Sequence, residues 1–98
     1  MTLEFVRFKL RDGVTDEELL EASRGVDAFL AEAPGFQSRQ LYRDPTHWID
    51  LVVWSDLAAA RAAAARIADD PRCTAFMDAI AAGSVVLSHA ELRSEHRG

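Results

Sequence analysis

The chain has 98 residues, of which 49% are hydrophobic and 28% charged, the balance of one globular domain with a single core. Sixteen acidic residues against eleven basic ones give a net charge of −5, which disfavours nucleic acid as a partner. The longest apolar run, Leu51 to Trp54, is far shorter than the ~20 residues that span a bilayer, so we expect no membrane association and a cytoplasmic protein. Cys73 is the only cysteine, which excludes an internal disulfide and a cysteine-cluster metal site.

The first half of the chain predicts a strand, a helix and a second strand. Residues 2–10 (TLEFVRFKL) alternate with a period of two and are rich in strand formers. Thr15 opens a capping box, so we expect a helix to begin there and to end at Pro34 and Gly35. Residues 36–43 form the next predicted strand, and their low apolar content is typical of a sheet edge.

The second half predicts a strand, a broken helix and a last strand. A turn leads into residues 47–54 (HWIDLVVW), the most apolar segment, which suits a central strand that is buried on both faces. A helix is expected over 57–68, and Pro71 is well placed to start another short helix after it. Residues 84–92 (SVVLSHAEL) form the fourth predicted strand.

The predicted order is β-α-β-β-α-β, an α+β ferredoxin-like fold in which helices cover one face of a four-stranded antiparallel sheet. In its usual strand order, four-one-three-two, the strands over 2–10 and 47–54 are central, in agreement with their apolar content. We expect residues 1–93 to form one domain and the polar tail over 94–98 to be disordered.

The sheet face away from the helices is also predicted to be apolar. Strand alternation places six hydrophobic side chains there: Leu3, Phe5, Ile49, Leu51, Val53 and Val86. Monomers rarely expose an apolar patch of this size, so we expect a second copy of the chain to cover it across a two-fold axis.

Several segments resemble the antibiotic biosynthesis monooxygenase superfamily. They are the opening LEFVRFKL, the helix end APGF, the strand WIDLVVWS, the alanine-rich helix and the closing SHAE, and together they extend over nearly the whole chain. The resemblance implies a homodimer, the dimeric α+β barrel, with a small-molecule pocket between each sheet and its helices. In the best-understood branch it implies cofactor-free oxygenation of aromatic polyketides. The haem-degrading branch uses an asparagine, and this sequence has none.

Glu4, His89 and Trp54 are predicted to lie on the helix-facing side of the sheet. If the first and last strands pair antiparallel, Glu4 lies beside the segment from His89 to Glu91, with Trp54 near it on the third strand. A carboxylate beside an imidazole can abstract a proton, and an indole can bind a planar ligand. In the structural alternative, Glu4 and His89 only satisfy each other at the sheet end and Trp54 belongs to the core.

Asp50 lies in the middle of the most apolar strand, where a carboxylate is costly unless it is paired or hydrated. It either lines a wet pocket or bonds to Gln40 or Tyr42, which the predicted hairpin places nearby. Trp48 and Tyr42 are assigned to the same face, where they either pack across the strands or contact a ligand.

The helix over 57–68 presents mostly alanine to the sheet, which leaves either close packing or unfilled space. Unfilled space there would be an apolar ligand site bounded by Trp54, Phe76, Met77 and Phe29. Four basic residues are assigned to the opposite sheet face, as a basic strip or as rim and solvent charges: Arg7, Lys9, Arg39 and Arg43. The histidines have no metal-ligand spacing, so no metal site is expected.

These residues favour a homodimeric, monooxygenase-like enzyme that acts on a small aromatic or enolisable, polyketide-like substrate without metal, flavin or other cofactor. His89, assisted by Glu4, would deprotonate the substrate to an anion that reduces dioxygen. Five further residues are expected to line the substrate pocket: Trp54, Trp48, Asp50, Tyr42 and Phe76. The alternative is a non-catalytic small-ligand binder or a structural dimer with the same fold.

Overall fold

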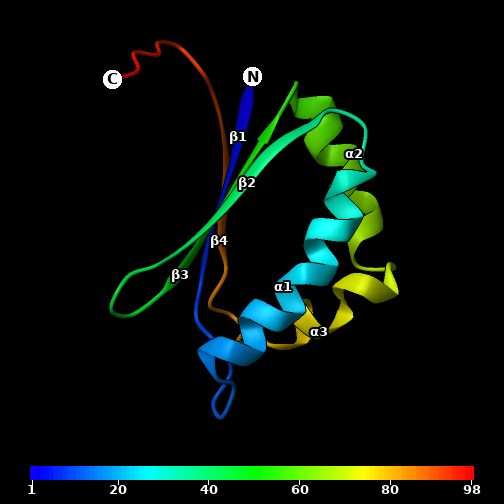
Figure 1. Ribbon diagram of the computed structural model, residues 1–98, viewed down its shortest axis with the longest axis vertical. Helices are drawn as coiled ribbons and strands as arrows, with labels where there is room; N and C mark the ends of the chain where they lie inside the picture. Colours follow the sequence, from blue (N-terminus) through cyan, green and yellow to red (C-terminus); the bar gives the residue numbers. More distant parts are fainter.

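The computed structural model describes residues 1–98 as two layers, a four-stranded antiparallel sheet and a layer of helices on one of its faces (Figure 1). The elements follow in the order β1 (Thr2–Phe8), α1 (Asp16–Ala31), β2 (Phe36–Arg43), β3 (Trp48–Trp54), α2 (Leu57–Ile67), the short 3₁₀ helix η1 (Pro71–Cys73), α3 (Thr74–Asp78) and β4 (Val86–Glu91). The strand order is β2-β3-β1-β4. The predicted ferredoxin-like fold and its strand order are therefore confirmed.

Helix α1 begins where the sequence predicts its cap. The Thr15 hydroxyl accepts the backbone N–H of Glu18, and the Glu18 carboxylate accepts the backbone N–H of Thr15, each at 3.1 Å. This reciprocal pair satisfies N–H groups that the first helical turn leaves without a partner. Leu19, Val26 and Phe29 recur on one side of α1 and are buried against the sheet.

Two glycines allow close approaches that a side chain would prevent. A Cβ at Gly25 in α1 would overlap the backbone carbonyl of Arg72, so the glycine lets η1 pack directly on α1. Gly35 has φ +84°, the left-handed conformation that turns the chain from α1 into β2. Its carbonyl accepts the N–H of Ser55 at 2.8 Å, which connects this turn to the end of β3.

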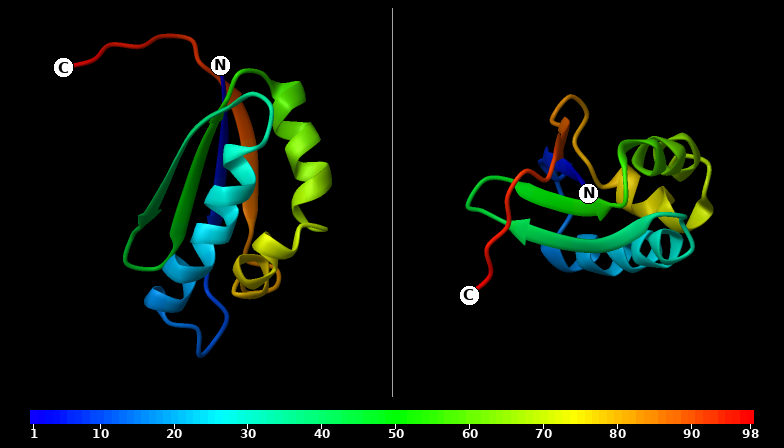
Figure 2. Two further views of the ribbon diagram at one scale, coloured as in Figure 1. Left: turned by 45° about the vertical axis from the view of Figure 1, so that its right-hand side comes forward. Right: turned by 90° about the horizontal axis from the view of Figure 1, so that it is seen from above.

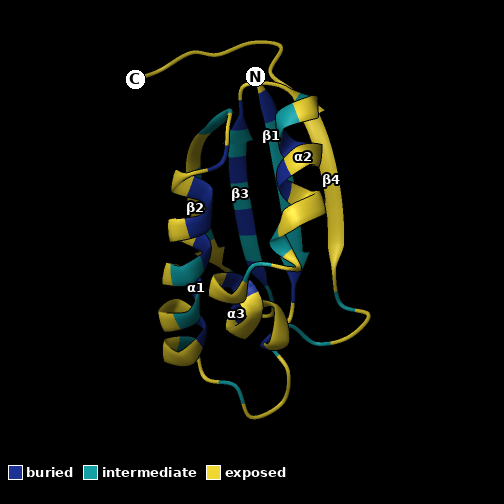
Figure 3. Ribbon diagram, turned by 90° about the vertical axis from the view of Figure 1, so that its right-hand side faces the viewer, coloured by how far each residue is buried: buried dark blue, intermediate teal, exposed yellow.

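The core lies between the sheet and the helices, and β3 contributes more to it than any other strand. Phe8, Trp54 and Cys73 are fully buried there. Figure 3 shows that the residues of β3 alternate between buried and intermediate, whereas β4 at the sheet edge is exposed along its whole length. Figure 2 shows α1 and α2 side by side on one side of the sheet. None of the helices combines the length and the hydropathy that crossing a membrane requires.

A bulge in β2 changes which side chains face the helices. Phe36 pairs with Trp54, but Ser38 pairs with Val53, so one extra residue of β2 lies between the two pairs. Beyond the bulge, three side chains share the face of the helices: Arg39, Leu41 and Arg43. Three others share the opposite face: Ser38, Gln40 and Tyr42.

The sequence-based assignment of β2 faces is therefore wrong from the bulge onward. Tyr42 and Gln40 do not share a face with Asp50, and Arg39 and Arg43 do not belong to a strip on the uncovered face. The prediction counted residues along an unbroken strand, and one inserted residue inverts every side chain that follows it.

Candidate functional site

Glu4 and His89 lie directly opposite each other on β1 and β4. Nε2 of His89 is 3.2 Å from Oε1 of Glu4, a hydrogen-bonding distance. The Glu4 and His89 side chains are 18% and 24% exposed, so the contact is half-shielded from water. The structure thus brings these two predicted residues together. The partner of Glu4 on β3 is Val52, and Trp54 instead pairs with Thr2.

The groups around Glu4 have opposing effects on the pKa of its carboxyl. Burial raises the pKa of the Glu4 carboxyl above its ordinary value of 4.5, because desolvation disfavours the ionised form. The hydrogen bond and charge of His89 lower that pKa, and the negative charge of Asp50 raises it. The net direction is upward, so the Glu4 carboxylate is a stronger base than one in water.

A cavity of about 160 Å³ lies beside this pair, between the sheet and the helices. Nine of its eleven lining residues are hydrophobic, and the other two are Glu4 and Asp50. Met77, Val85 and Leu87 form an apolar rim of exposed side chains on the side of the uncovered strand β4. An apolar cavity with a few polar groups is the usual character of a small-ligand site.

A second charged cluster, centred on Arg39, lies under α1. Nε and Nη2 of Arg39 donate to the two carboxylate oxygens of Asp50 at 3.0 and 2.9 Å, a bidentate pair. Nη1 donates to Oγ of Ser23 at 2.6 Å and to Asp27 at 2.9 Å. The guanidinium carbon lies 5.1 Å from the centre of the Phe76 ring. The Arg39 side chain is only 5% exposed.

Arg39 is the partner of Asp50 that the sequence analysis missed. The predicted partners Gln40 and Tyr42 lie on the other sheet face, while Asp50 both lines the cavity and is paired. Burial opposes the charge of Arg39, but the hydrogen bonds and charges of Asp50 and Asp27 outweigh it and hold the pKa of Arg39 above its usual value. The cost of a carboxylate in an apolar strand indicated that Asp50 needs a partner or water, but the bulge in β2 concealed that Arg39 is the partner.

The other predicted pocket residues take different positions. Phe76 and Met77 line the cavity. Trp54 and Trp48 are buried but belong to the core outside the cavity lining, and the indole N–H of Trp54 has no partner within the chain. Tyr42 is half exposed on the sheet face without helices. The structure therefore gathers Phe76 and Asp50 with Glu4 and separates the two tryptophans and Tyr42 from them.

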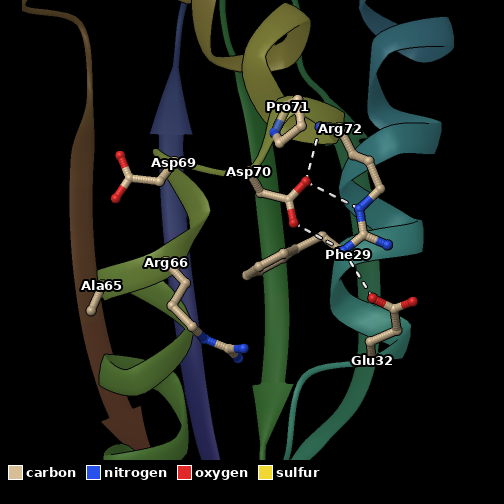
Figure 4. A pocket seen from close by; sticks show the side chains of 8 residues that line it. All are labelled: Phe29, Glu32, Ala65, Arg66, Asp69, Asp70, Pro71 and Arg72. Atoms are coloured by element: carbon tan, nitrogen blue, oxygen red, sulfur yellow. Dashed lines mark hydrogen bonds and ion pairs between the residues drawn. The ribbon is translucent and has the colours of Figure 1, made fainter.

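A second hollow, of about 260 Å³, lies between the C-terminal parts of α1 and α2, and Figure 4 shows its polar lining. Phe29, predicted as a wall of the cavity, lines this hollow instead, with the guanidinium of Arg66 at 5.7 Å from its ring. Arg72 contacts the carboxylates of Asp70 and Glu32, each at 2.9 Å. The Arg72–Glu32 pair connects η1 to the end of α1, and the two carboxylates together offset the charge of Arg72.

The two remaining histidines lie away from the cavity. His47 lies in the β2–β3 turn, where Nδ1 is 2.7 Å from the Thr46 hydroxyl. Desolvation and the positive charges of Arg7 and Lys9 lower the pKa of His47. His96 lies in the exposed C-terminal segment. Nowhere do three His, Cys, Asp or Glu side chains gather so that they could share a metal ion.

Solved structures similar to this chain include oxygenases. SnoaB, a cofactor-independent oxygenase from Streptomyces nogalater, is 25% identical with a TM-score of 0.68, over 98% of this chain and 95% of SnoaB. The monooxygenase of the Streptomyces coelicolor gene ActVA-Orf6, solved with the ligand nanaomycin D, is 22% identical with a TM-score of 0.73, over 99% and 91%. An MhuD variant with two manganese protoporphyrin IX bound per active site is 15% identical with a TM-score of 0.73, over the full length of both chains.

No family model matches the sequence, and no curated protein matches it. The similarity to the solved structures extends over nearly the whole chain and establishes the fold. The chain is an α+β ferredoxin-like protein with the fold of the antibiotic biosynthesis monooxygenases, so the resemblance noted in the sequence is confirmed at the level of structure.

Proposed function

We propose that the protein is a cofactor-independent monooxygenase that oxidises a small aromatic or enolisable substrate in the cavity between sheet and helices. The observation that carries this proposal is the 3.2 Å contact of Glu4 with His89 at the wall of an apolar cavity. A partly desolvated carboxylate that is held by an imidazole is suited to proton abstraction. The description of SnoaB as a cofactor-independent oxygenase supports the same chemistry.

The two residues divide the proton transfer between them. The sequence analysis expected His89 to take the proton with the help of Glu4. Because Glu4 lines the cavity and His89 does not, we assign the first transfer to the Glu4 carboxylate. His89 orients that carboxylate through their contact and can receive the proton from it. Glu4 is thus the catalytic residue of the proposal, and His89 is a positioning residue.

The proposed reaction balances without a cofactor. Glu4 removes a proton from an enolisable carbon or a ring hydroxyl, and the electron-rich anion reduces dioxygen by forming a C–O bond. The resulting peroxide anion takes back the proton and then loses water. A methylene group, or in a hydroxy-aromatic a ring C–H ortho or para to the hydroxyl, has become a carbonyl. One oxygen atom enters the product, the other leaves as water, and the substrate supplies all the electrons.

The experiment is oxygen uptake with a panel of electron-rich hydroxy-aromatics and cyclic diketones, with labelled dioxygen to follow one oxygen atom into the product. Glu4→Gln should lower the rate by about 10²- to 10⁴-fold, the usual contribution of a general base. Glu91→Gln is the matched control, because Glu91 shares the sheet face, bonds to Thr2 at 2.7 Å and lies outside the cavity. Equal rates for Glu4→Gln and the parent would rule Glu4 out as the base.

We further propose that two copies associate through the sheet face that carries no helix. Six hydrophobic side chains lie on this face: Leu3, Phe5, Ile49, Leu51, Val53 and Val86. The five on β1 and β3 are half-buried within one chain, and Val86 on β4 is 59% exposed. An apolar face of this kind is typical of a contact between copies. Sedimentation at micromolar concentration should give twice the chain mass of 10.8 kDa, and a monomer would contradict the proposal.

A further inference from the structure

The charges around the cavity restrict what can enter it. Both polar residues of its lining are acidic, Glu4 and Asp50. The guanidinium of Arg39, which pairs with Asp50, donates its hydrogen bonds to Asp50, Asp27 and Ser23. An anionic ligand would therefore meet carboxylates in an apolar space without a free cation to stabilise it.

The volume and the walls of the cavity restrict the ligand further. The cavity holds about 160 Å³, and an apolar cavity of ~150 Å³ in another protein accommodates one benzene ring. Phe8 and Phe76 line it, and their rings pack edge to face with centroids 5.7 Å apart. Both rings are buried in the core, so they cannot turn aside without a loss of packing. Because the two rings contact each other, they form one aromatic surface of the cavity, against which a planar ring can pack.

We propose that the cavity binds an uncharged, single-ring hydroxy-aromatic molecule whose hydroxyl group donates a hydrogen bond to the Glu4 carboxylate. This inference rests on the proposed function for the choice of site, and it narrows the substrate from aromatic or enolisable compounds in general to a phenol-type ring. The ring occupies the apolar part of the cavity, and Ile80 limits its size on the side of α3.

The probes are phenol, benzoate and naphthol, which differ in charge and in ring number. Binding is measured by calorimetry without oxygen, so that turnover has no part in the result. Phenol should bind the parent protein, and benzoate should bind at least about tenfold more weakly because its charge is unpaired in the cavity. Naphthol should bind the parent more weakly than phenol does, because its second ring exceeds the available volume.

Two variants assign these preferences to named residues. Glu4→Gln should weaken the binding of phenol roughly tenfold, because a neutral hydrogen-bond acceptor replaces a charged one. Ile80→Ala enlarges the cavity and should strengthen the binding of naphthol relative to that of phenol. Leu20→Ala is the matched control, since Leu20 is exposed on α1 outside the cavity lining, and it should change neither ligand.

The outcomes separate this inference from the proposed function. Benzoate or naphthol binding the parent as tightly as phenol, or phenol not binding at all, would overturn the single-ring assignment. Selective phenol binding without oxygen uptake by any hydroxy-aromatic would refute the oxygenase and leave the binding site in place. Oxygen uptake with a multi-ring substrate, together with tight naphthol binding, would refute the single-ring assignment and leave the proposed oxygenase in place.

Discussion

Two acid–base pairs lie on the helix-facing side of the sheet, and their surroundings differ. Arg39 and Asp50 connect β2 to β3 beneath α1, with side chains 5% and 10% exposed and with hydrogen bonds to α1 as well. Glu4 and His89 connect β1 to β4, and Figure 3 shows that β4 is exposed at the edge of the sheet. The one side-chain hydrogen bond of Glu4 and His89 is to each other. Each pair contributes one carboxylate to the cavity lining, Asp50 from β3 and Glu4 from the neighbouring strand β1.

The difference shows which pair is free to react. The donors of Arg39 are occupied by Asp50, Asp27 and Ser23, so this cluster fixes the geometry of β2, β3 and α1. Glu4 keeps an oxygen without a partner at the cavity wall and has a perturbed proton affinity. Perturbed groups in a cleft are typical of functional sites, whereas saturated networks are typical of structural ones.

The largest effect on stability should come from breaking the Arg39–Asp50 pair, whose hydrogen-bonding groups are occupied. Arg39→Met leaves the Asp50 carboxylate buried without its cation, which should lower the free energy of unfolding by about 3–5 kcal/mol. Urea denaturation measures this loss. The double variant Arg39→Met with Asp50→Leu removes both charges and should recover most of the stability. A loss below that of an exposed ion pair would mean that the cluster is not structural.

Breaking the Glu4–His89 pair should lower stability much less. His89→Phe keeps the ring volume and removes the contact to Glu4, and because both side chains are partly exposed the free energy of unfolding should fall by no more than about 1 kcal/mol. Turnover, in contrast, should fall well below the folded fraction. A variant that unfolds like Arg39→Met would place the two pairs in the same structural class.

The Glu4 carboxyl should also make stability depend on pH. Its pKa is raised in the folded chain, mainly by burial, so folding favours the protonated form. Its contribution is complete below the ordinary value of 4.5 and is lost as the pH rises through the higher folded value. Glu4→Gln should therefore gain stability relative to the parent as the pH rises above 4.5, which denaturation at several pH values would detect. A constant difference would contradict the raised pKa.

The smallest effect should come from the rim of the saturated cluster. Asp27 contacts Arg39 at 2.9 Å, but its side chain is 64% exposed, and Arg39 keeps Asp50 and Ser23 when Asp27 is changed. Asp27→Asn should therefore change the free energy of unfolding by less than about 1 kcal/mol. A larger loss in urea denaturation would show that the cluster depends on its outer charge.

The same two pairs show how much of the site the sequence predicts. The Glu4–His89 contact was predictable because β1 and β4 are unbroken strands in which alternation gives the face and antiparallel pairing gives the neighbour. The Arg39–Asp50 pair was not, because the bulge near Ser38 inverts β2 and nothing in the local pattern marks it.

The cavity was predicted only in part, for a related reason. Phe76 and Met77 were expected to bound the cavity, and both line it. Trp54 and Phe29 were expected there as well, but Trp54 belongs to the core outside the cavity lining and Phe29 lines the other hollow. Capping and alternation are local properties, whereas the position of unfilled space depends on how all the elements pack.

The central claim is that Glu4 and His89 form a contact pair in a partly desolvated site, and titration of the Glu4 carboxyl by nuclear magnetic resonance tests it most directly. His89 lowers the pKa of Glu4 through its hydrogen bond and charge, while burial raises it. His89→Phe keeps the burial and removes the two lowering effects, so the pKa of Glu4 should rise further. An unchanged or lower pKa in this variant would show that the two side chains are not partners and would contradict the account.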